Sequence, residues 1–490
     1  MAFLTEAANR GSVSTGYDVD NSLKLETDNT EYLHKTNSSS GDRRTFTLSA
    51  WIKRTEINRG SGGGDYIFSA GDGDYNQSDR TLLKFNHDDT IYWGGGGAYE
   101  IKTNRVFRDT YAWYHIAMIV DTTNSTAGDR LKLYVNGVRE TDLATNTNPS
   151  QNFQYAFMKD DKQVVGYNHT DSSNPAAMYI AEVVWLDGTA ASITDLGEFD
   201  EDSNIWKPVD PSGLTFGTNG CYLDFEDSSN LGNDKNGGTD FTEVNITAAD
   251  QAQDSPTNNF SVLVPCYEAT ASSTLSEGSL KWDINMPSGS DFNHNTTAMS
   301  TFQMSGTNGG KWYIETKITN NNRAHAGIFS SLNFLQQTSD PTEYVYWDFY
   351  NGWIGSSLIS TETNPPSIEN NDIVGIAIDC DNQRVTFSKN GGWLVANGDM
   401  TGTSPSDWRW DWTSDSTFLD DPKCNGNVAF YCGIATSANV YRPIHLVNFG
   451  GYSPFTISSG NSDANGYGNF EYAVPSGFYA LCTKNLAEYG

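Results

Sequence analysis

Apolar and polar residues alternate along most of the chain, and helical periodicity is nearly absent. Residues 45–53 show the pattern most clearly, and alternation at this spacing predicts a half-buried β-strand. The side chains on its apolar face are Phe46, Leu48, Ala50 and Ile52. Mostly apolar runs predict interior strands, and further alternating runs predict strands of the same kind. These segments are residues 114–121, 179–186, 311–318, 372–379, 428–434 and 445–449.

Two Asn-Gly pairs predict tight β-hairpins. Asn136-Gly137 follows the alternating residues 131–135, and Asn390-Gly391 follows residues 384–389. An Asn-Gly pair accepts the positive φ angles that a two-residue hairpin turn requires. Short strands at regular spacing with such turns indicate an all-β sandwich or jelly roll.

The texture of the chain changes between its two halves. Residues 224–260 are rich in Asp, Asn, Ser, Thr and Gly, with isolated phenylalanines that a floppy linker would lack. We therefore expect an all-β protein of two β-sandwich (jelly-roll) domains joined by an ordered connector. The predicted parts are an N-terminal docking segment (1–18), a first sandwich (19–210), the connector (211–264) and a second sandwich with a C-terminal extension (265–490).

Composition and charge narrow the function. The 490 residues are 13% aromatic and 19% charged, which is typical of a folded chain, and the net charge is −31. Such an acidic balance argues against nucleic-acid binding and against docking on anionic membranes. The longest apolar runs have the length of strands, so we expect no membrane insertion. The first residues lack a basic, then apolar, stretch, so we expect no secretory signal.

Several motifs resemble known families. The first half resembles the laminin-G or concanavalin-A-like jelly roll, and the second half resembles the SPRY sandwich. Other strings resemble a group of structural proteins of tailed marine bacteriophages. The jelly-roll motifs are residues 46–53, 106–109, 113–116, 131–137 and 181–188, and the SPRY motifs are 310–315, 372–379, 385–391 and 447–450. The phage-like strings are residues 217–220, 223–225, 240–242, 254–260 and 475–486.

The resemblance implies a virion structural protein, made in the host cytoplasm, with a place on the tail or the outer capsid. Both folds imply recognition through loops, because sandwiches display binding loops at their ends. We therefore expect a tail fibre or tail-associated adhesin that binds a host surface glycan or protein. The alternatives are a capsid decoration or head-fibre protein and, from another class, a glycan depolymerase. A cellular lectin-like adhesin is a third alternative, which the expected lack of a secretory signal disfavours.

Residues 407–412 read Asp-Trp-Arg-Trp-Asp-Trp, which is the most unusual string in the chain. Strict alternation would place Trp408, Trp410 and Trp412 on one face. An exposed row of indoles could stack on the apolar faces of sugar rings and form a glycan or receptor site. The alternative is a strand that packs this row into the core or an interface, which the usual burial of large aromatics favours.

Residues 72–79 read Asp-Gly-Asp-Tyr-Asn-Gln-Ser-Asp. The loop spaces oxygen ligands in a way that suits a hard cation, so calcium is a candidate cofactor with ligands from Asp72, Asp74, Asn76 and Asp79. The loop lacks the glycine and the distal glutamate of the EF-hand pattern. An acidic surface turn is the favoured alternative.

No group of residues predicts catalysis. Residues 198–202 alternate acids as glucanases of the jelly-roll fold do, but they follow the last predicted strand of the sandwich and end in Asp202 rather than a glutamate. Neither a His-Glu-x-x-His nor a Gly-x-Ser-x-Gly motif occurs. We therefore expect a binding protein and not an enzyme.

The expected partners are other virion proteins and a host cell-surface glycan or protein. Virion proteins usually occur in symmetric multiples, so we expect a homo-oligomer, with a trimer favoured. No heptad run occurs, so globular faces rather than a long stalk would form it. Residues 1–18 and 457–467 are candidate docking segments.

Overall fold

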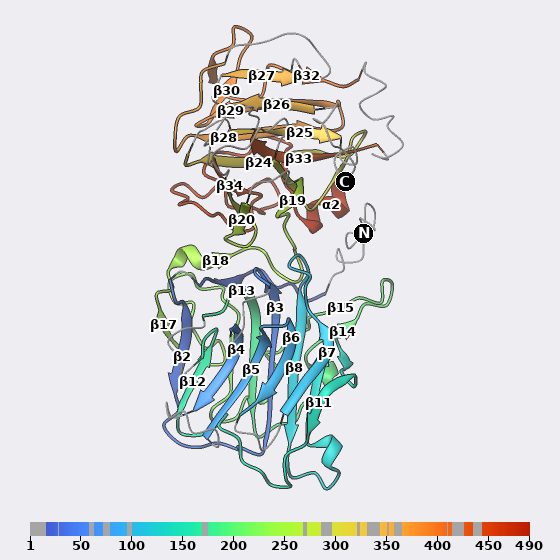
Figure 1. The fold of residues 1–490 in the computed structure, drawn as a ribbon, viewed down its shortest axis with the longest axis vertical. Helices are drawn as coiled ribbons and strands as arrows, with labels where there is room; N and C mark the ends of the chain where they lie inside the picture. The colour runs from blue at the N-terminus through green and yellow to red at the C-terminus, as the bar shows by residue number, and fades with distance from the viewer. Residues whose placement is uncertain are drawn as a thin grey trace. The chain divides into compact units, whose positions relative to one another are not determined.

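The chain forms two units of mostly antiparallel β-sheet, an N-terminal unit of residues 14–258 and a C-terminal unit of residues 259–490 (Figure 1). The structure is a computed structural model. It describes residues 16–27, 29–57, 63–71, 79–95, 100–168, 175–267, 272–285, 296–320, 324–330, 344–349, 352–356, 365–408, 410–413, 426–434 and 443–490.

The N-terminal unit is a sandwich of two eight-stranded sheets. Sheet 1 contains, in spatial order, β10 (Val138–Arg139), β9 (Leu131–Val135), β8 (Tyr114–Asp121), β3 (Thr45–Arg54), β13 (Met178–Asp187), β1 (Ser22–Leu25) and β18 (Gln251–Ala252), with β16 (Cys221–Leu223) also beside β13. Sheet 2 contains β11 (Leu143–Thr147), β7 (Glu100–Val106), β6 (Thr90–Gly94), β5 (Arg80–Asn86), β4 (Gly64–Gly71), β12 (Lys162–Val165), β2 (Tyr32–Thr36) and β17 (Thr242–Val244). The hairpin β14 (Glu198–Phe199) and β15 (Trp206–Lys207) stands beside them.

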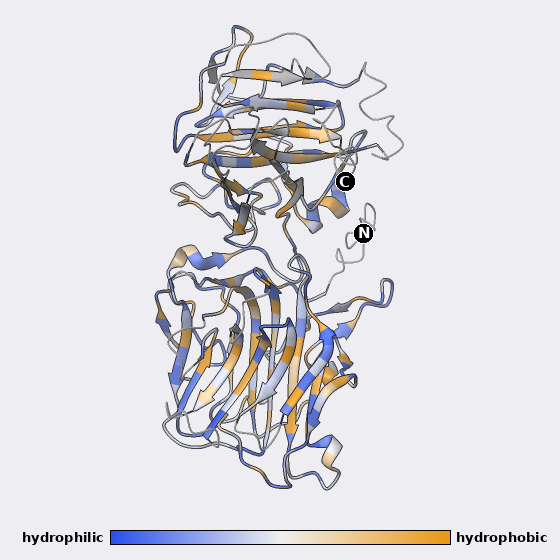
Figure 2. Ribbon diagram, viewed as in Figure 1, coloured by the Kyte–Doolittle hydropathy of each residue, from blue (hydrophilic) through white to orange (hydrophobic). Residues whose placement is uncertain are grey.

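The main core lies between these two sheets. The predicted apolar face of β3 is confirmed, because Phe46, Leu48, Ala50 and Ile52 all belong to this core. Aromatic rings from the two sheets meet across it, with the rings of Phe68 and Trp185 5.2 Å apart. Figure 2 shows hydrophobic and hydrophilic residues alternating along the strands of this unit.

Strand β3 is buried on both faces, so the prediction of a half-buried strand is wrong. Trp51 on the outer face packs in a second cluster with Val19, Ala181 and Trp206. A third cluster places Phe216 and Tyr222 on the same sheet. Segments far from β3 in the sequence therefore cover the outer face of sheet 1, which alternation within one strand cannot reveal.

The residues predicted as a connector, 211–264, do not stand between the units. Up to Asn258 they belong to the N-terminal unit, where they supply β16, β17 and β18 to the two sheets. The isolated aromatics in this stretch explain the difference, because Phe225 and Phe241 are part of the main core.

Both predicted hairpins are confirmed. Asn136 and Gly137 have φ angles of 48° and 76° between β9 and β10. Asn390 and Gly391 have φ angles of 49° and 80° between β29 (Arg384–Lys389) and β30 (Gly392–Leu394). Positive φ at both central residues is the geometry for which an Asn-Gly pair is suited.

The C-terminal unit also has two sheets. Sheet 3 contains β19 (Leu263–Tyr267), β22 (Thr296–Ser300), β33 (Asn427–Ile434), β25 (Ala324–Ser330), β26 (Tyr344–Asp348) and β27 (Trp353–Ser356), with β23 (Met304–Ser305) beside β33. Sheet 4 contains β20 (Ser272–Ser276), β21 (Lys281–Asn285), β34 (Ile444–Asn448), β24 (Lys311–Ile318), β28 (Ile373–Asp379), β29, β30 and β31 (Met400–Gly402), with β32 (Trp410–Asp411) beside β29 and β35 (Tyr479–Ala480) beside β24.

The core of the C-terminal unit lies between sheets 3 and 4, where the rings of Trp347 and Phe387 meet 6.0 Å apart. The C-terminal segment covers the outer face of sheet 4, because Phe470 and Phe478 pack with Tyr313. The chain ends in α2 (Thr483–Tyr489). Among the residues that the structure describes, no helix has the length and apolar character to cross a membrane.

Candidate functional site

The three predicted tryptophans do not form one exposed row. Trp412 is buried with 1% of its surface exposed, and its indole Nε1 donates to the carbonyl oxygen of Gly306 at 2.9 Å. Trp408 is half-buried, with the Arg384 guanidinium 4.2 Å from its ring centroid. The ring of Phe478 stacks with Trp408 at a centroid distance of 6.1 Å. The side chain of Trp410 lies outside the described residues.

The predicted platform therefore loses Trp412, whose placement is a correction. The reason is local. Strand β32 is only two residues long, so the alternation assumed over six residues does not hold. Trp408 packs against the C-terminal segment instead of standing free in a row.

The candidate calcium loop lies outside the described residues for Asp72, Asp74 and Asn76, and only Asp79 is described. Calcium binding there stays a prediction. Within the described ranges, no group of three or more His, Cys, Asp or Glu side chains is arranged to hold a metal ion.

The acidic residues 198–202 lie on the β14–β15 hairpin. The Lys207 ammonium pairs with Glu198 at 3.3 Å and with Asp200 at 3.4 Å, measured from Nζ to a carboxylate oxygen. The hairpin is held by Trp206, whose ring packs so closely on the β9–β10 turn that a Cβ on Gly137 would lie 2.2 Å from its Cε3 atom. The two acids therefore share one cation at the surface of a docked hairpin.

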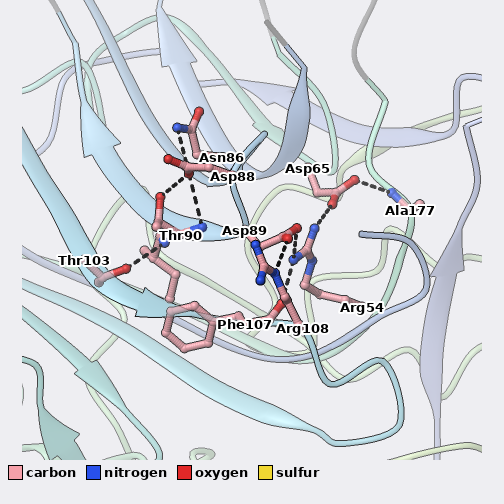
Figure 3. Close-up of polar contacts among 11 residues, drawn as sticks. Arg54, Asp65, Asn86, Asp88, Asp89, Thr90, Thr103, Phe107, Arg108 and Ala177 are labelled. Atoms are coloured by element: carbon pink, nitrogen blue, oxygen red, sulfur yellow. Dashed lines mark hydrogen bonds and ion pairs between the residues drawn. The ribbon is translucent and has the colours of Figure 1, made fainter. Parts of the chain in front are cut away.

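The N-terminal unit contains a buried network of charged residues that the sequence motifs did not predict. We call it the rim site, and define it as Arg54, Asp65, Asp89, Phe107 and Arg108 (Figure 3). Arg54 ends β3, Asp65 lies near the start of β4, Asp89 lies in the turn between β5 and β6, and Arg108 follows β7. These positions flank or lie in three connections at one end of the sandwich, β3–β4, β5–β6 and β7–β8.

The Arg54 guanidinium connects the two sheets. Its Nη2 atom donates to Asp65 Oδ2 at 3.0 Å, and its Nη1 atom donates to Asp89 Oδ1 at 3.1 Å and to the Phe107 carbonyl oxygen at 2.7 Å. Arg54, Asp65 and Asp89 are buried. The second oxygen of Asp65 accepts the backbone N–H of Ala177, just before β13, at 3.2 Å (Figure 3).

Burying three charged groups costs free energy. Well-packed apolar residues in their place often give a protein of equal or greater stability. We therefore infer that the network serves to fix the positions of loops. It fastens the loop after β3, the β5–β6 turn, the loop after β7 and the segment before β13 to one another. Loops held on a rigid scaffold are where binding residues usually lie.

Residues 107–113 form the exposed part of this end. Arg108 and Asp109 are exposed, while Tyr111 and Trp113 are half-exposed. Trp113 Nε1 donates to Asp254 Oδ1 at 3.0 Å, and the buried Lys53 pairs with the other oxygen of Asp254 at 2.7 Å. The loop thus presents aromatic and charged groups from a backbone anchored at both ends.

Exposed apolar side chains gather on the same unit. The five large hydrophobic residues that are exposed within the described ranges all belong to it: Ile57, Val106, Val138, Phe199 and Ile205. Ile57 follows β3, and Val106 ends β7, so these two flank the rim site in sequence.

One sequence signal could have revealed the rim site. Arg54 lies two residues after Ile52, on the inward face of an alternating strand. An arginine at an inward position must find buried acceptors, so it predicts nearby carboxylates. Which carboxylates they are depends on strand pairing, which spacing alone does not give.

Two buried glutamates outside the rim site fasten peripheral segments. In the N-terminal unit, Glu182 accepts the Tyr17 hydroxyl at 3.0 Å and the Tyr222 hydroxyl at 3.1 Å. Glu182 has a φ of 52° at a bulge of β13, between the stretch paired with β1 and the stretch paired with β16. Burial raises the pKa of Glu182 to about 8.

In the C-terminal unit, Glu315 on β24 plays a similar part. Its carboxylate oxygens accept the backbone N–H groups of Glu471 and Tyr472, each at 2.9 Å, and the Tyr313 hydroxyl at 3.0 Å. Burial raises the pKa of Glu315 to about 7. Neither glutamate has a cation among its described hydrogen-bond partners.

The two units are β-sandwiches, and in the first one the rim site holds the loops at one end together. Residues 26–189 match the model of the Concanavalin A-like lectin/glucanases superfamily, and residues 311–401 match that of the SPRY domain. The chain thus carries a concanavalin-A-like jelly roll followed by a SPRY domain, which confirms both fold resemblances. No curated protein matches the chain.

Solved structures show low overall similarity. Domains LG4-5 of the mouse laminin alpha1 chain are 8% identical, with 93% of this chain and 87% of that chain covered and a TM-score of 0.28. The SAP-like pentraxin from Limulus polyphemus is 16% identical, and the match covers 36% of this chain and 82% of that chain with a TM-score of 0.27. The SPRY domain of human HERC1 is 9% identical, covers 36% and 92%, and has a TM-score of 0.25.

Proposed function

We propose that this chain is a recognition protein of a virion, a tail fibre or tail-associated adhesin, that binds a glycan or protein on the host surface. The observation that carries the binding part is the rim site. In this site, a buried arginine and two buried carboxylates hold loops together at one end of a lectin-like sandwich. The loop that follows Phe107 carries the exposed Arg108 and Asp109 and the half-exposed Tyr111 and Trp113.

The virion part of the proposal is supported by the phage-like strings at residues 217–260 and 475–486. A tail or outer-capsid position would expose the loop end to host cells. We further propose contacts with other virion proteins and a homo-oligomer, with a trimer favoured. Light scattering of the purified chain tests the copy number, and a stable monomer would remove the trimer.

The binding part is tested with the full chain, labelled and applied to host cells. The double variant Ile57→Ser/Tyr111→Ala removes an apolar and an aromatic side chain from the loop end without touching the buried network. A matched control, Arg44→Ala/Gln151→Ala, removes exposed side chains from connections before β3 and before β12. We expect the first variant to lose most cell binding and the control to keep it. Equal binding by both would overturn the loop end as the recognition surface.

The position in the particle is tested by immunogold labelling of purified virions. Label on the tail supports the adhesin. Label confined to the head would favour a decoration or head-fibre protein, and virions without label would end the virion proposal. Release of reducing sugar from host polysaccharide would favour a depolymerase instead of a pure binding protein.

A further inference from the structure

Arg108 is an exposed cation with an unusually fixed orientation. Its Nε atom donates to Asp89 Oδ2 at 2.8 Å, and its side chain is 61% exposed (Figure 3). Asp89 is buried and is held on its other oxygen by Arg54. A long surface side chain normally samples many rotamers, so this contact to a fixed carboxylate limits the directions in which the guanidinium can point.

The bond through Nε leaves the outer edge of the guanidinium available. Among the described residues, none is placed to bond the Nη1 and Nη2 atoms of Arg108. The described ion pair of Arg108 is with Asp89 and not with the adjacent Asp109, whose Oδ1 accepts the backbone N–H of Tyr111 at 2.9 Å. Two parallel N–H groups on a planar fork match the two oxygens of a carboxylate or sulfate.

The residues around Arg108 indicate what kind of molecule carries the anionic group. Tyr111 and Trp113 lie on the same loop and are half-exposed, and flat aromatic faces stack on sugar rings. Across the whole chain, acidic residues outnumber basic ones by 61 to 30, so a cation left without a second acid stands out. Several other cations lie near Arg108 in the sequence or across the sheet, including Lys102 and Arg105.

We propose that the loop end of the N-terminal unit binds an acidic saccharide, with its carboxylate or sulfate on the outer edge of Arg108. This inference rests on the proposed recognition function and names the chemical class of its ligand. Asp89 acts as a positioning residue, because it holds the guanidinium and does not touch the ligand. The fork requires two oxygens in one plane, so charge alone is not sufficient.

The test measures binding of the full chain to three immobilised polymers: polygalacturonate, dextran sulfate and neutral dextran. The variants are Arg108→Gln, Arg108→Lys and two matched controls. Arg105→Gln removes an exposed arginine that stacks on the Phe107 ring, and Arg44→Gln removes an exposed arginine next to the start of β3. The thermal unfolding midpoint of each variant verifies that it folds.

We expect binding to at least one acidic polymer, none to neutral dextran, and weaker binding at high salt because exposed charges are screened. Arg108→Gln should weaken binding by at least about tenfold, since it removes charge-assisted hydrogen bonds to the anion. Arg108→Lys keeps the charge but not the fork, so it should recover less than half of that loss in free energy. The two controls should bind like the wild type.

The possible results distinguish a failure of the acidic-ligand proposal from a failure of the proposed recognition function. Preference for polygalacturonate or for dextran sulfate identifies the anion. Host-cell binding that is unchanged in Arg108→Gln would overturn the acidic ligand but leave the recognition function standing. An equal loss in Arg105→Gln would also overturn it, by showing a general charge effect. Absence of binding to host cells by the wild type would overturn the recognition function itself.

Discussion

Two regions of the N-terminal unit bury carboxyl groups in different ways. At the rim site, Asp65 and Asp89 share the guanidinium of Arg54, so each negative charge has a fixed positive partner. On the outer face of sheet 1, the hydrogen-bond donors described for the carboxylate of Glu182 are the hydroxyl groups of Tyr17 and Tyr222. Burial without a cation raises the pKa of Glu182 to about 8.

The difference teaches what each arrangement can do. An arginine stays charged at every ordinary pH, so the positive partner that Arg54 supplies to the rim site does not change near neutral pH. Glu182 changes charge near neutral pH, and it fastens Tyr17 near the N-terminal end of the unit. Glu315 in the C-terminal unit follows the second arrangement, because it fastens Glu471 and Tyr472 and its pKa is raised to about 7.

The largest effect is expected from breaking the rim site at Arg54. Arg54→Met removes the only guanidinium described between Asp65 and Asp89 and leaves two carboxylates buried without it. We expect a loss of about 3–5 kcal/mol in the free energy of unfolding of the N-terminal unit, measured by urea denaturation. Adding Asp65→Asn and Asp89→Asn should recover part of the loss. A loss under about 1 kcal/mol would show that the network is not buried as described.

Next in size is the pH dependence caused by Glu182. A carboxyl group usually titrates near 4.5, and the pKa of Glu182 in the folded chain is about 8. The folded state therefore holds a proton that the unfolded state has lost, and stability falls as pH rises from about 4.5 to about 8. The slope approaches about 1.4 kcal/mol per pH unit. Urea denaturation of the N-terminal unit across this range measures it.

The control for this slope is a change of side-chain chemistry at constant shape. Glu182→Gln cannot ionise, so its stability relative to the wild type should rise steadily between pH 5 and pH 8. Glu198→Gln, at a mostly exposed glutamate, should keep the wild-type slope. A wild-type slope that persists in Glu182→Gln would assign the titration to another group.

The sequence predicted the strands and hairpins because these depend on neighbours along the chain. Alternation from Phe46 to Ile52 placed one face of β3 in the core, and Asn136-Gly137 determined a turn. The outer face of β3 could not be predicted, since its cover comes from distant segments that include Trp206. The tryptophan row failed for a related reason, because β32, which pairs with β29, ends at Asp411, and Trp412 after it is buried.

The rim site lies between these cases. The inward position of Arg54 was readable from β3, whereas its partners were not. Asp65 and Asp89 come from separate connections that only the pairing of β4, β5 and β6 brings to one end of the unit. Both buried glutamates were unpredictable for the same reason, because alternation does not show which segment will lie over a strand.

A smaller pH effect is expected in the C-terminal unit. The pKa of Glu315 is raised to about 7, so stability should fall as pH rises from about 4.5 to about 7, a narrower window than that of Glu182. Glu315→Gln should flatten this fall while the slope of the N-terminal unit remains. Thermolysin cleavage within residues 453–478, followed at pH 5.5 and pH 7.5, reports on the fastened segment. Equal pH dependence of cleavage in both proteins would contradict the role of Glu315.

The smallest effect is expected from weakening one donor at Glu182. Tyr17→Phe removes a hydroxyl that donates to the carboxylate, and a lost hydrogen bond of this kind costs about 1 kcal/mol. The ionised form of Glu182 loses more than the protonated form, because a carboxylate needs donors. The stability deficit of Tyr17→Phe should therefore grow as pH rises from 6 to 9. Thr257→Val, which removes the hydroxyl bonded to the backbone of Val19, loosens the same segment without touching Glu182, so its deficit should be constant over that range. A deficit that grows equally in both variants would mean that the segment as a whole, and not the carboxylate, responds to pH.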